Sequence, residues 1–240
     1  MAKPLRERLN QKDPSGLKAT ENRRAREMQR DLDALMKRII EQLPPGASAE
    51  DVRRIVDREL AGYSAEARAK VIEWVQDTEQ RAVLRSRQVL KAAGVRVDAV
   101  LGPTGEISPE LRRRIEINVE AEIDSLSADA KKVLTRSLID GITAGEGARV
   151  LARRIEDDMA MPRQRAELIA RTETMRAFND TSKEQYARYG IERVEWLATP
   201  DGRTCSVCGA LHGRSWPLGE EPPCPAHPRC RCVILPVTDA

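Results

Sequence analysis

The chain has 240 residues, of which 33% are charged and only 3% are aromatic. This composition is typical of solvated helices with aliphatic seams, and it argues against a β-sandwich or a doubly wound sheet. A net charge of +3 excludes a chain that binds nucleic acid through its overall charge.

Charge is nevertheless uneven, because residues 1–30 hold nine Lys or Arg against four Asp or Glu. Such a basic arm is typical of a segment that contacts DNA or an acidic partner. The alternative is that it is the solvated start of a helix. No apolar run reaches the roughly 18–20 residues of a transmembrane helix, and no signal peptide is visible. We therefore expect a cytosol-like compartment, where clustered cysteines are more often metal ligands than disulfides.

The first half of the chain is predicted to be helical after an irregular start at residues 1–16. Apolar spacings of three and four predict a helix over 17–43, which Pro44-Pro45-Gly46 ends. Ser48, with Asp51 three residues later, predicts a capping box and a short second helix. A third helix is expected to start at Tyr63-Ser64 and to end near Ala93.

The best candidate for a domain boundary is 95–105, which contains Gly102-Pro103-Thr104-Gly105. After it, Ser108-Pro109 predicts another helix start. The remaining patterns predict helices at about 127–142 and 146–158, a long helix from Pro162 to about Tyr189, and strands at 193–197 and 232–237.

The predicted fold is mainly α: long helices followed by a small C-terminal β/loop zinc-binding module. We expect a helical N-terminal region over 1–105 and a second domain over 106–240, with the Cys/His module at 193–237.

All five cysteines and both histidines lie between positions 205 and 232. Zinc takes four tetrahedral thiolate or imidazole ligands, and two ligands a short turn apart bind it with little strain. Cys205-x-x-Cys208 and His227-x-x-Cys230 are two such pairs, so a structural Zn²⁺ on these four residues is predicted. Disulfides, or reduced core cysteines, are the alternatives.

Cys232 competes with Cys230 for the fourth position. If this segment is extended, their side chains point to opposite sides, and only one of them binds. Cys224 is a weaker candidate than Cys232 for the fourth ligand. His212 is expected to be a surface turn residue.

A catalytic zinc is not predicted. Hydrolysis needs an open coordination position and a nearby carboxylate base. Glu220 and Glu221 are close in sequence, but four protein ligands close the site. The His-x-Glu of zinc deaminases is also missing from the sequence.

Several segments carry a family resemblance, including the Ala170-Arg171-Thr172-Glu173 stretch of the long helix. Asp201-Gly-Arg-Thr-Cys-Ser-Val-Cys208 and His227-Pro-Arg-Cys-Arg-Cys232 follow it. In this order they resemble the phage Mu F-like family of minor head proteins, also called the phage head morphogenesis domain, over roughly Ser108 to Val237. In this chain His212 stands where an acidic or other polar residue is expected, and Cys224 is an additional cysteine.

The resemblance implies a minor capsid or head morphogenesis protein of a tailed phage, prophage or gene-transfer particle. Such a protein is made in the bacterial cytoplasm and resides in the virion, at the capsid interior or portal vertex. The implied partners are the portal protein and the major capsid protein, with packaged DNA as a further candidate and no membrane.

Four residues are expected to support the cysteine loop. Arg171 and Glu173 lie two apart on a helix, so each must find its partner elsewhere. With the resemblance, we expect Glu173 to accept hydrogen bonds from loop N–H groups, Arg171 to clamp Asp201 or a carbonyl, and Asn179 to cap or brace the same loop. Ordinary solvated helix charges are the alternative for Arg171 and Glu173.

The alternative function is a zinc-dependent DNA-binding protein or a nuclease acting during packaging. Four arginines near the predicted ligands are the candidate phosphate contacts for this alternative. They are Arg203, Arg214, Arg229 and Arg231.

Overall fold

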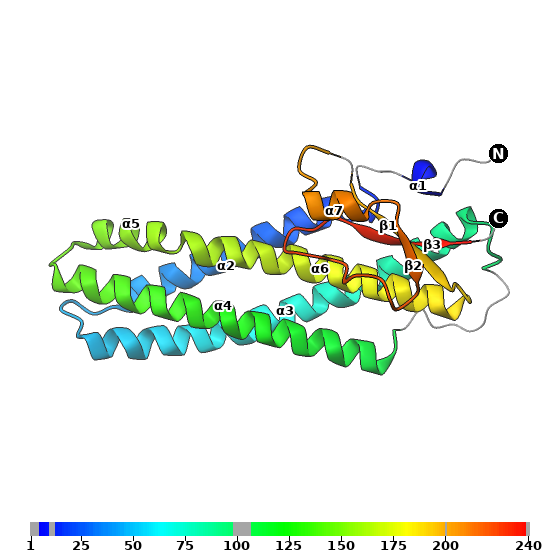
Figure 1. The fold of residues 1–240 in the computed structure, drawn as a ribbon. Coiled ribbons are helices and arrows are strands. Elements are labelled where there is room, and N and C mark those ends of the chain that lie inside the picture. Colours follow the sequence, from blue (N-terminus) through cyan, green and yellow to red (C-terminus); the bar gives the residue numbers. More distant parts are fainter. Residues whose placement is uncertain (1–4, 10–12, 98–106, 200, 239–240) are drawn as a thin grey trace. The chain divides into compact units, whose positions relative to one another are not determined.

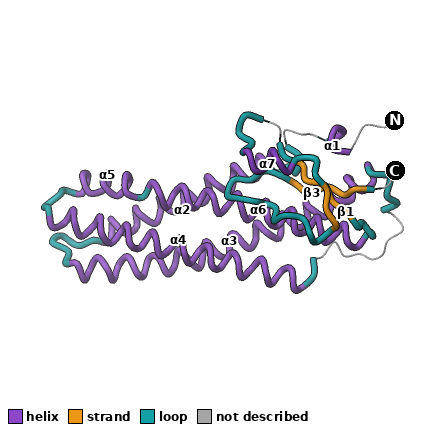
Figure 2. The backbone as a smooth tube through the Cα atoms, in the orientation of Figure 1, coloured by secondary structure: helices purple, strands orange, loops and turns teal. Residues whose placement is uncertain are grey.

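A computed structural model describes residues 5–9, 13–97, 107–199 and 201–238 (Figures 1 and 2). Within them the helices are α1 (Leu5–Arg8), α2 (Lys18–Gln42), α3 (Ala49–Ala92), α4 (Pro109–Thr143), α5 (Ala148–Asp158), α6 (Ala160–Arg188) and α7 (Ser206–Leu211). The strands are β1 (Arg193–Leu197), β2 (Ser215–Pro217) and β3 (Val233–Val237). The predicted class, mainly helical with a small C-terminal sheet, is confirmed.

The chain divides into two compact units, each discontinuous in sequence. The mixed unit comprises Met1–Glu21, Glu73–Ile115 and Arg171–Ala240, and the helical unit comprises Asn22–Ile72 and Glu116–Ala170. Helices α2, α3, α4 and α6 each contribute residues to both units. This division differs from the predicted one at 105/106. Most of the candidate boundary at 95–105 lies outside the described residues.

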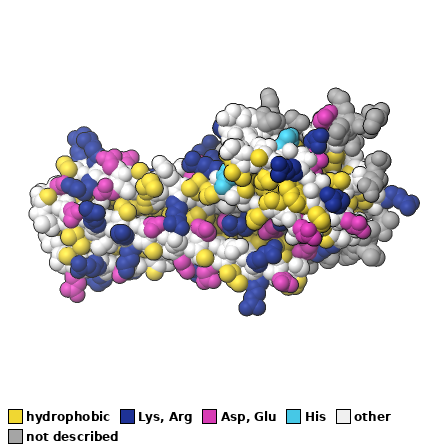
Figure 3. Space-filling view, in the orientation of Figure 1, with side chains coloured by type: hydrophobic (Ala, Val, Ile, Leu, Met, Phe, Trp, Pro, Cys, Tyr) yellow, Lys and Arg dark blue, Asp and Glu magenta, His cyan; other side chains and the backbone are white. Residues whose placement is uncertain are grey.

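Aliphatic stripes on its helices form the core of the helical unit. Its fully buried side chains include Met28, Leu32, Leu35, Ile39, Val52, Val56, Val119, Ile123, Leu126, Leu134 and Leu138. Ion pairs such as Lys131–Asp57 and Arg68–Asp124, both at 2.7 Å, lie outside this core. On the face shown in Figure 3, side chains of both charge signs are interspersed along the helices. Exposed pairs contribute little to stability, so burial of the stripes dominates it.

The predicted capping box is confirmed at the start of α3. The backbone N–H of Asp51 donates to Ser48 Oγ at 3.1 Å, and Ser48 N–H donates to Asp51 Oδ2 at 3.1 Å. These reciprocal bonds satisfy two of the donors that a helix start leaves without partners.

Two predicted helix breaks are wrong, because α3 runs through Tyr63-Ser64 and α4 runs through Ser127. Ser64 Oγ donates to the carbonyl of Leu60 in the preceding turn at 2.8 Å, so the hydroxyl is satisfied inside the helix. It also lies 2.7 Å from Ser127 Oγ. The two serines that suggested helix starts therefore join two continuous helices.

The mixed unit contains an antiparallel sheet with the order β2-β1-β3. Leu197 pairs with Val233 where β1 ends and β3 begins. The segment between these two residues, which contains α7 and β2, therefore starts and ends at the same end of the sheet. Trp196 is fully buried in a cluster with Val194 and Ile234. The strands predicted at 193–197 and 232–237 are confirmed, whereas β2 and α7 lie in what was expected to be loop.

The N-terminal helix α1 was also not predicted, since residues 1–16 had an irregular pattern. Arg6 Nη1 donates to both carboxylate oxygens of Glu195 on β1, at 3.0 and 3.1 Å. Leu5 and Leu9 pack against a buried cluster that includes Leu197 and Val233. These tertiary contacts hold a helix too short to be stable alone.

Candidate metal centre

The first pair of candidate ligands lies at the start of α7. Cys205 is the N-cap residue, and its Sγ accepts a hydrogen bond from the backbone N–H of Cys208 at 3.3 Å. A cap and the residue three positions later lie on the same side of the first turn. The short helix therefore turns both thiols toward one point.

The second pair lies on a tight turn before β3. The N–H of Cys230 donates to the carbonyl of His227 at 3.1 Å, and Arg229 adopts a positive φ of 63°. His227 Nδ1 lies 2.7 Å from the carbonyl oxygen of Pro228. A proton on Nδ1 that donates to this carbonyl leaves Nε2 as the ligand atom, the usual arrangement for a metal-binding histidine.

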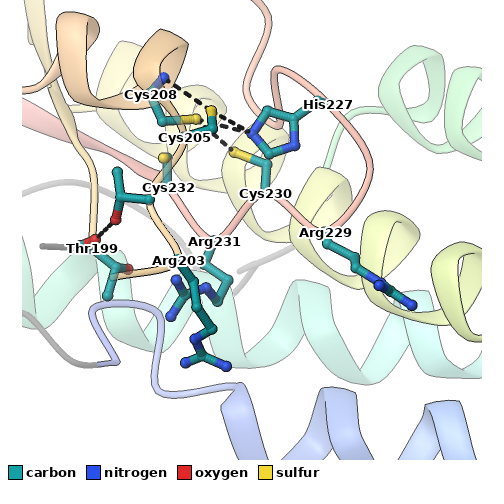
Figure 4. A pocket seen from close by; sticks show the side chains of 10 residues that line it. Thr199, Arg203, Cys205, Cys208, His227, Arg229, Cys230, Arg231 and Cys232 are labelled. Atoms are coloured by element: carbon teal, nitrogen blue, oxygen red, sulfur yellow. Dashed lines mark hydrogen bonds between the residues drawn. The ribbon is translucent and has the colours of Figure 1, made fainter. Parts of the chain in front are cut away.

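The start of α7, with Cys205 and Cys208, lies against the turn that carries His227 and Cys230 (Figure 4). His227 Nε2 lies 3.3 Å from Cys205 Sγ and 3.1 Å from Cys208 Sγ. Cys208 Sγ lies 3.8 Å from Cys230 Sγ. Around a tetrahedral zinc, Zn–S and Zn–N distances require S–S edges of about 3.8 Å and S–N edges of about 3.5 Å. The spacing of these side chains therefore fits a metal ion.

The ligand-type atoms form two overlapping groups, each with all its atoms within 4.8 Å of one another. One group is Cys205, Cys208 and His227, and the other is Cys208, Cys230 and Cys232. The expectation that Cys230 and Cys232 point to opposite sides is wrong. Both precede the first residue of β3, so strand alternation does not apply to them.

Burial and mutual contact set the proton affinities of the thiols. Burial raises the pKa of Cys208 to about 12 and the pKa of Cys224 well above its usual range. Hydrogen bonds from the Cys224 and Cys232 thiols lower the pKa of Cys230 to about 2. The pKa of Cys205 is lowered, first by the N–H of Cys208. A buried thiolate at Cys230 needs a positive partner, and a metal ion supplies one.

Two further ligand-type residues are placed differently. His212 is exposed at the end of α7, where its Nδ1 accepts the N–H of Ala198 at 3.2 Å; it belongs to neither group. Cys224 is buried, and its Sγ donates to the carbonyl of Cys232 at 3.3 Å.

Asn179 on α6 is completely buried beneath the segment that carries Cys232. Its Nδ2 donates to the carbonyl of Cys232 at 3.1 Å, and its Oδ1 accepts the N–H of Ile234 at 3.1 Å. Tyr186 OH donates to the carbonyl of Ile234 at 3.3 Å. Side chains of α6 thus satisfy backbone groups of the chain that returns from the ligand loop.

Asp201 is clamped, but by different arginines from the one expected. Both its carboxylate oxygens accept from Arg231 at 2.7 Å, and Arg203 contributes a third side-chain bond at 3.1 Å. The Arg231 guanidinium holds the pKa of Asp201 well below its usual range. This bidentate pair joins the segment before Cys205 to the segment between Cys230 and Cys232. In the sequence, this ion pair could have been suggested by an acidic residue, Asp201, beside one ligand pair and a basic residue, Arg231, beside the other.

Glu173 is buried, at 2% exposure, and forms an ion pair with Arg176 on the same helix. Arg171 precedes it on α6 and is half-buried. An ion pair that was not predicted from the sequence connects α6 to the chain before Cys224. Lys183 on α6 lies 3.3 Å from Glu221 and 3.0 Å from Asp180.

A hollow of about 20 Å³ lies among the ligands, which is room for an ion or a water molecule. Three of the four predicted DNA-contact arginines, Arg203, Arg229 and Arg231, line it (Figure 4). Arg214 is exposed in the turn before β2.

Residues 132–235 match the family model described as phage Mu protein F like protein. The match confirms the resemblance to the phage head morphogenesis family for this part of the chain, and it contains all of the candidate ligands. Searches of curated proteins and of solved structures found no match. Among the described residues, no helix has an apolar stretch long enough to span a membrane.

Proposed function

We propose that this chain is a minor capsid or head morphogenesis protein of a tailed phage, prophage or gene-transfer particle. The family match over residues 132–235 carries the proposal. The protein would associate with the portal and major capsid proteins, in the capsid interior or at the portal vertex. Its continuous helices offer charged surfaces of both signs, which suits docking on protein subunits.

Within that role, we propose that Cys205, Cys208, His227 and Cys230 hold a structural Zn²⁺. Thiolate and imidazole donors favour zinc over harder cations. The support is geometric: Cys205, Cys208 and His227 form one group of mutually close ligand atoms, and Cys230 Sγ lies 3.8 Å from Cys208 Sγ. We assign the ion no catalytic step, since its proposed ligands fill all four positions.

The assembly role is tested by placing an affinity tag on the chain in cells that produce particles. Purified particles should contain the protein, and chemical cross-linking with mass spectrometry should join it to portal or capsid subunits. An untagged strain controls for adhesion to particles. Particles that form normally without the chain, and never contain it, would contradict the role.

The second candidate is a DNA-binding protein or nuclease, favoured by the arginines around the hollow. It is the weaker candidate because Arg203 and Arg231 are already paired with Asp201. A DNA mobility shift that weakens steeply with salt and is lost in Arg214→Ala/Arg229→Ala would favour DNA binding. Metal-dependent cleavage of plasmid would favour the nuclease.

A further inference from the structure

The metal module contains more ligands than one tetrahedral ion uses. Besides the four proposed zinc ligands, two more thiols, Cys224 and Cys232, are buried at 4% and 3% exposure. With one zinc, both remain neutral, and the Cys224 thiol makes weak hydrogen bonds to the Cys232 carbonyl at 3.3 Å and to the Cys230 side chain. The excess of thiols raises the question of a second ion.

The two ligand groups overlap in a way that suits a pair of ions. Cys208 belongs to both groups, and its Sγ lies 3.8 Å from that of Cys230. Two four-coordinate ions need eight donor positions. Six ligands supply eight positions when two thiolates each bind both ions, and thiolates are soft enough to bridge.

We propose that the module holds two thiolate-bound divalent ions of the zinc type, bridged by Cys208 and Cys230. This inference rests on the proposed metal-binding function. The terminal ligands of the first ion are Cys205 and His227, and those of the second are Cys224 and Cys232.

Charge and position support this assignment. Five thiolates and two divalent ions leave one net negative charge, and the Arg229 side chain lines the same hollow, where Arg231 is paired with Asp201. Cys224 lies next to Cys232, because its Sγ donates to the Cys232 carbonyl at 3.3 Å.

Titration of the reduced, metal-free full-length chain with Co²⁺ or Cd²⁺ measures the capacity directly. Thiolate charge-transfer absorption should rise to an end point at two equivalents, and the protein reconstituted with ¹¹³Cd should show two mutually coupled resonances. An end point at one equivalent overturns the second ion and leaves the structural zinc intact. No binding at all overturns both.

Cys224→Ser separates the two positions, because it removes a terminal ligand from the second ion only. It should bind one equivalent tightly, with far-UV circular dichroism unchanged. His212→Gln is the control, since His212 is exposed and its Nδ1 accepts the N–H of Ala198, and it should retain two equivalents. Retention of two equivalents by Cys224→Ser would overturn the role of Cys224.

Discussion

The helical unit and the Cys/His module (residues 193–237) keep their structure by different means. In the helical unit, long helices bury continuous aliphatic stripes, and each contact adds to a large apolar core. In the module, short elements and loops are held by side-chain hydrogen bonds, one bidentate ion pair and a cluster of thiols. The helical unit therefore depends on buried area, and the ligand loop of the module, outside its buried β1–β3 cluster, depends on a few specific bonds.

Metal removal should give the largest difference in stability between the two regions. Structural zinc contributes about 10–16 kcal/mol of apparent folding free energy in zinc-finger peptides. A strong chelator under reducing conditions, or Cys208→Ser, should therefore remove amide hydrogen-exchange protection from residues 201–232, while the helical unit stays protected. Mass-spectrometric exchange checks this. Equal protection with and without metal would show that the ion does not hold the loop.

Truncating a core side chain of the helical unit should destabilise that unit and leave the metal module unchanged. Leu134 on α4 is fully buried, so Leu134→Ala should lower the free energy of unfolding of the helical unit by about 2–5 kcal/mol without changing the metal content. Denaturant titration and metal analysis measure both. Ile117→Ala is the control on the same helix, because Ile117 is 55% exposed and its truncation should cost about 0.5 kcal/mol or less.

Asn179→Ala should affect the module by an intermediate amount. The change leaves the buried N–H of Ile234 without its acceptor, which typically costs about 1–3 kcal/mol. Zinc release to a chromogenic chelator should become faster, and denaturant stability should fall. Asn118→Ala is the control, since Asn118 is half-buried on α4. Release at the wild-type rate would show that Asn179 does not support the loop.

The smallest expected effect is the pH dependence of the capping box in the helical unit. Hydrogen bonds from Ser48 lower the pKa of Asp51 from 3.8 to about 2. A depressed pKa stabilises the fold above the unfolded value of 3.8, and this stabilisation is lost as pH falls toward 2. Asp51→Asn should therefore lower Tm slightly at pH 7, and its difference from the wild type should vanish across that window. A difference independent of pH would contradict an electrostatic cap.

Local signals explain what the sequence predicted and what it did not. The Pro44-Pro45-Gly46 break and the Ser48 cap are short-range features, so they are readable without the fold. Ser64 and Ser127 misled because their partners are the preceding turn and each other.

At the candidate site, clustering and spacing indicated the two ligand pairs. The side-chain directions of Cys230 and Cys232, and the Arg231–Asp201 clamp, depend on how the chain returns to β3. Nothing in the local pattern specifies that path.

The pairing of Leu197 with Val233 has a consequence for the evolution of the loop. Because β1 pairs with β2 as well as with β3, the chain between β2 and His227 spans two fixed points, with one ion pair from Lys183 to Glu221 along the way. The entropy of closing such a segment grows slowly, by about 0.6 kcal/mol for each doubling of its length. Insertions around residues 219–220, between β2 and the Lys183–Glu221 ion pair, should therefore cost little stability while the ligands keep their positions.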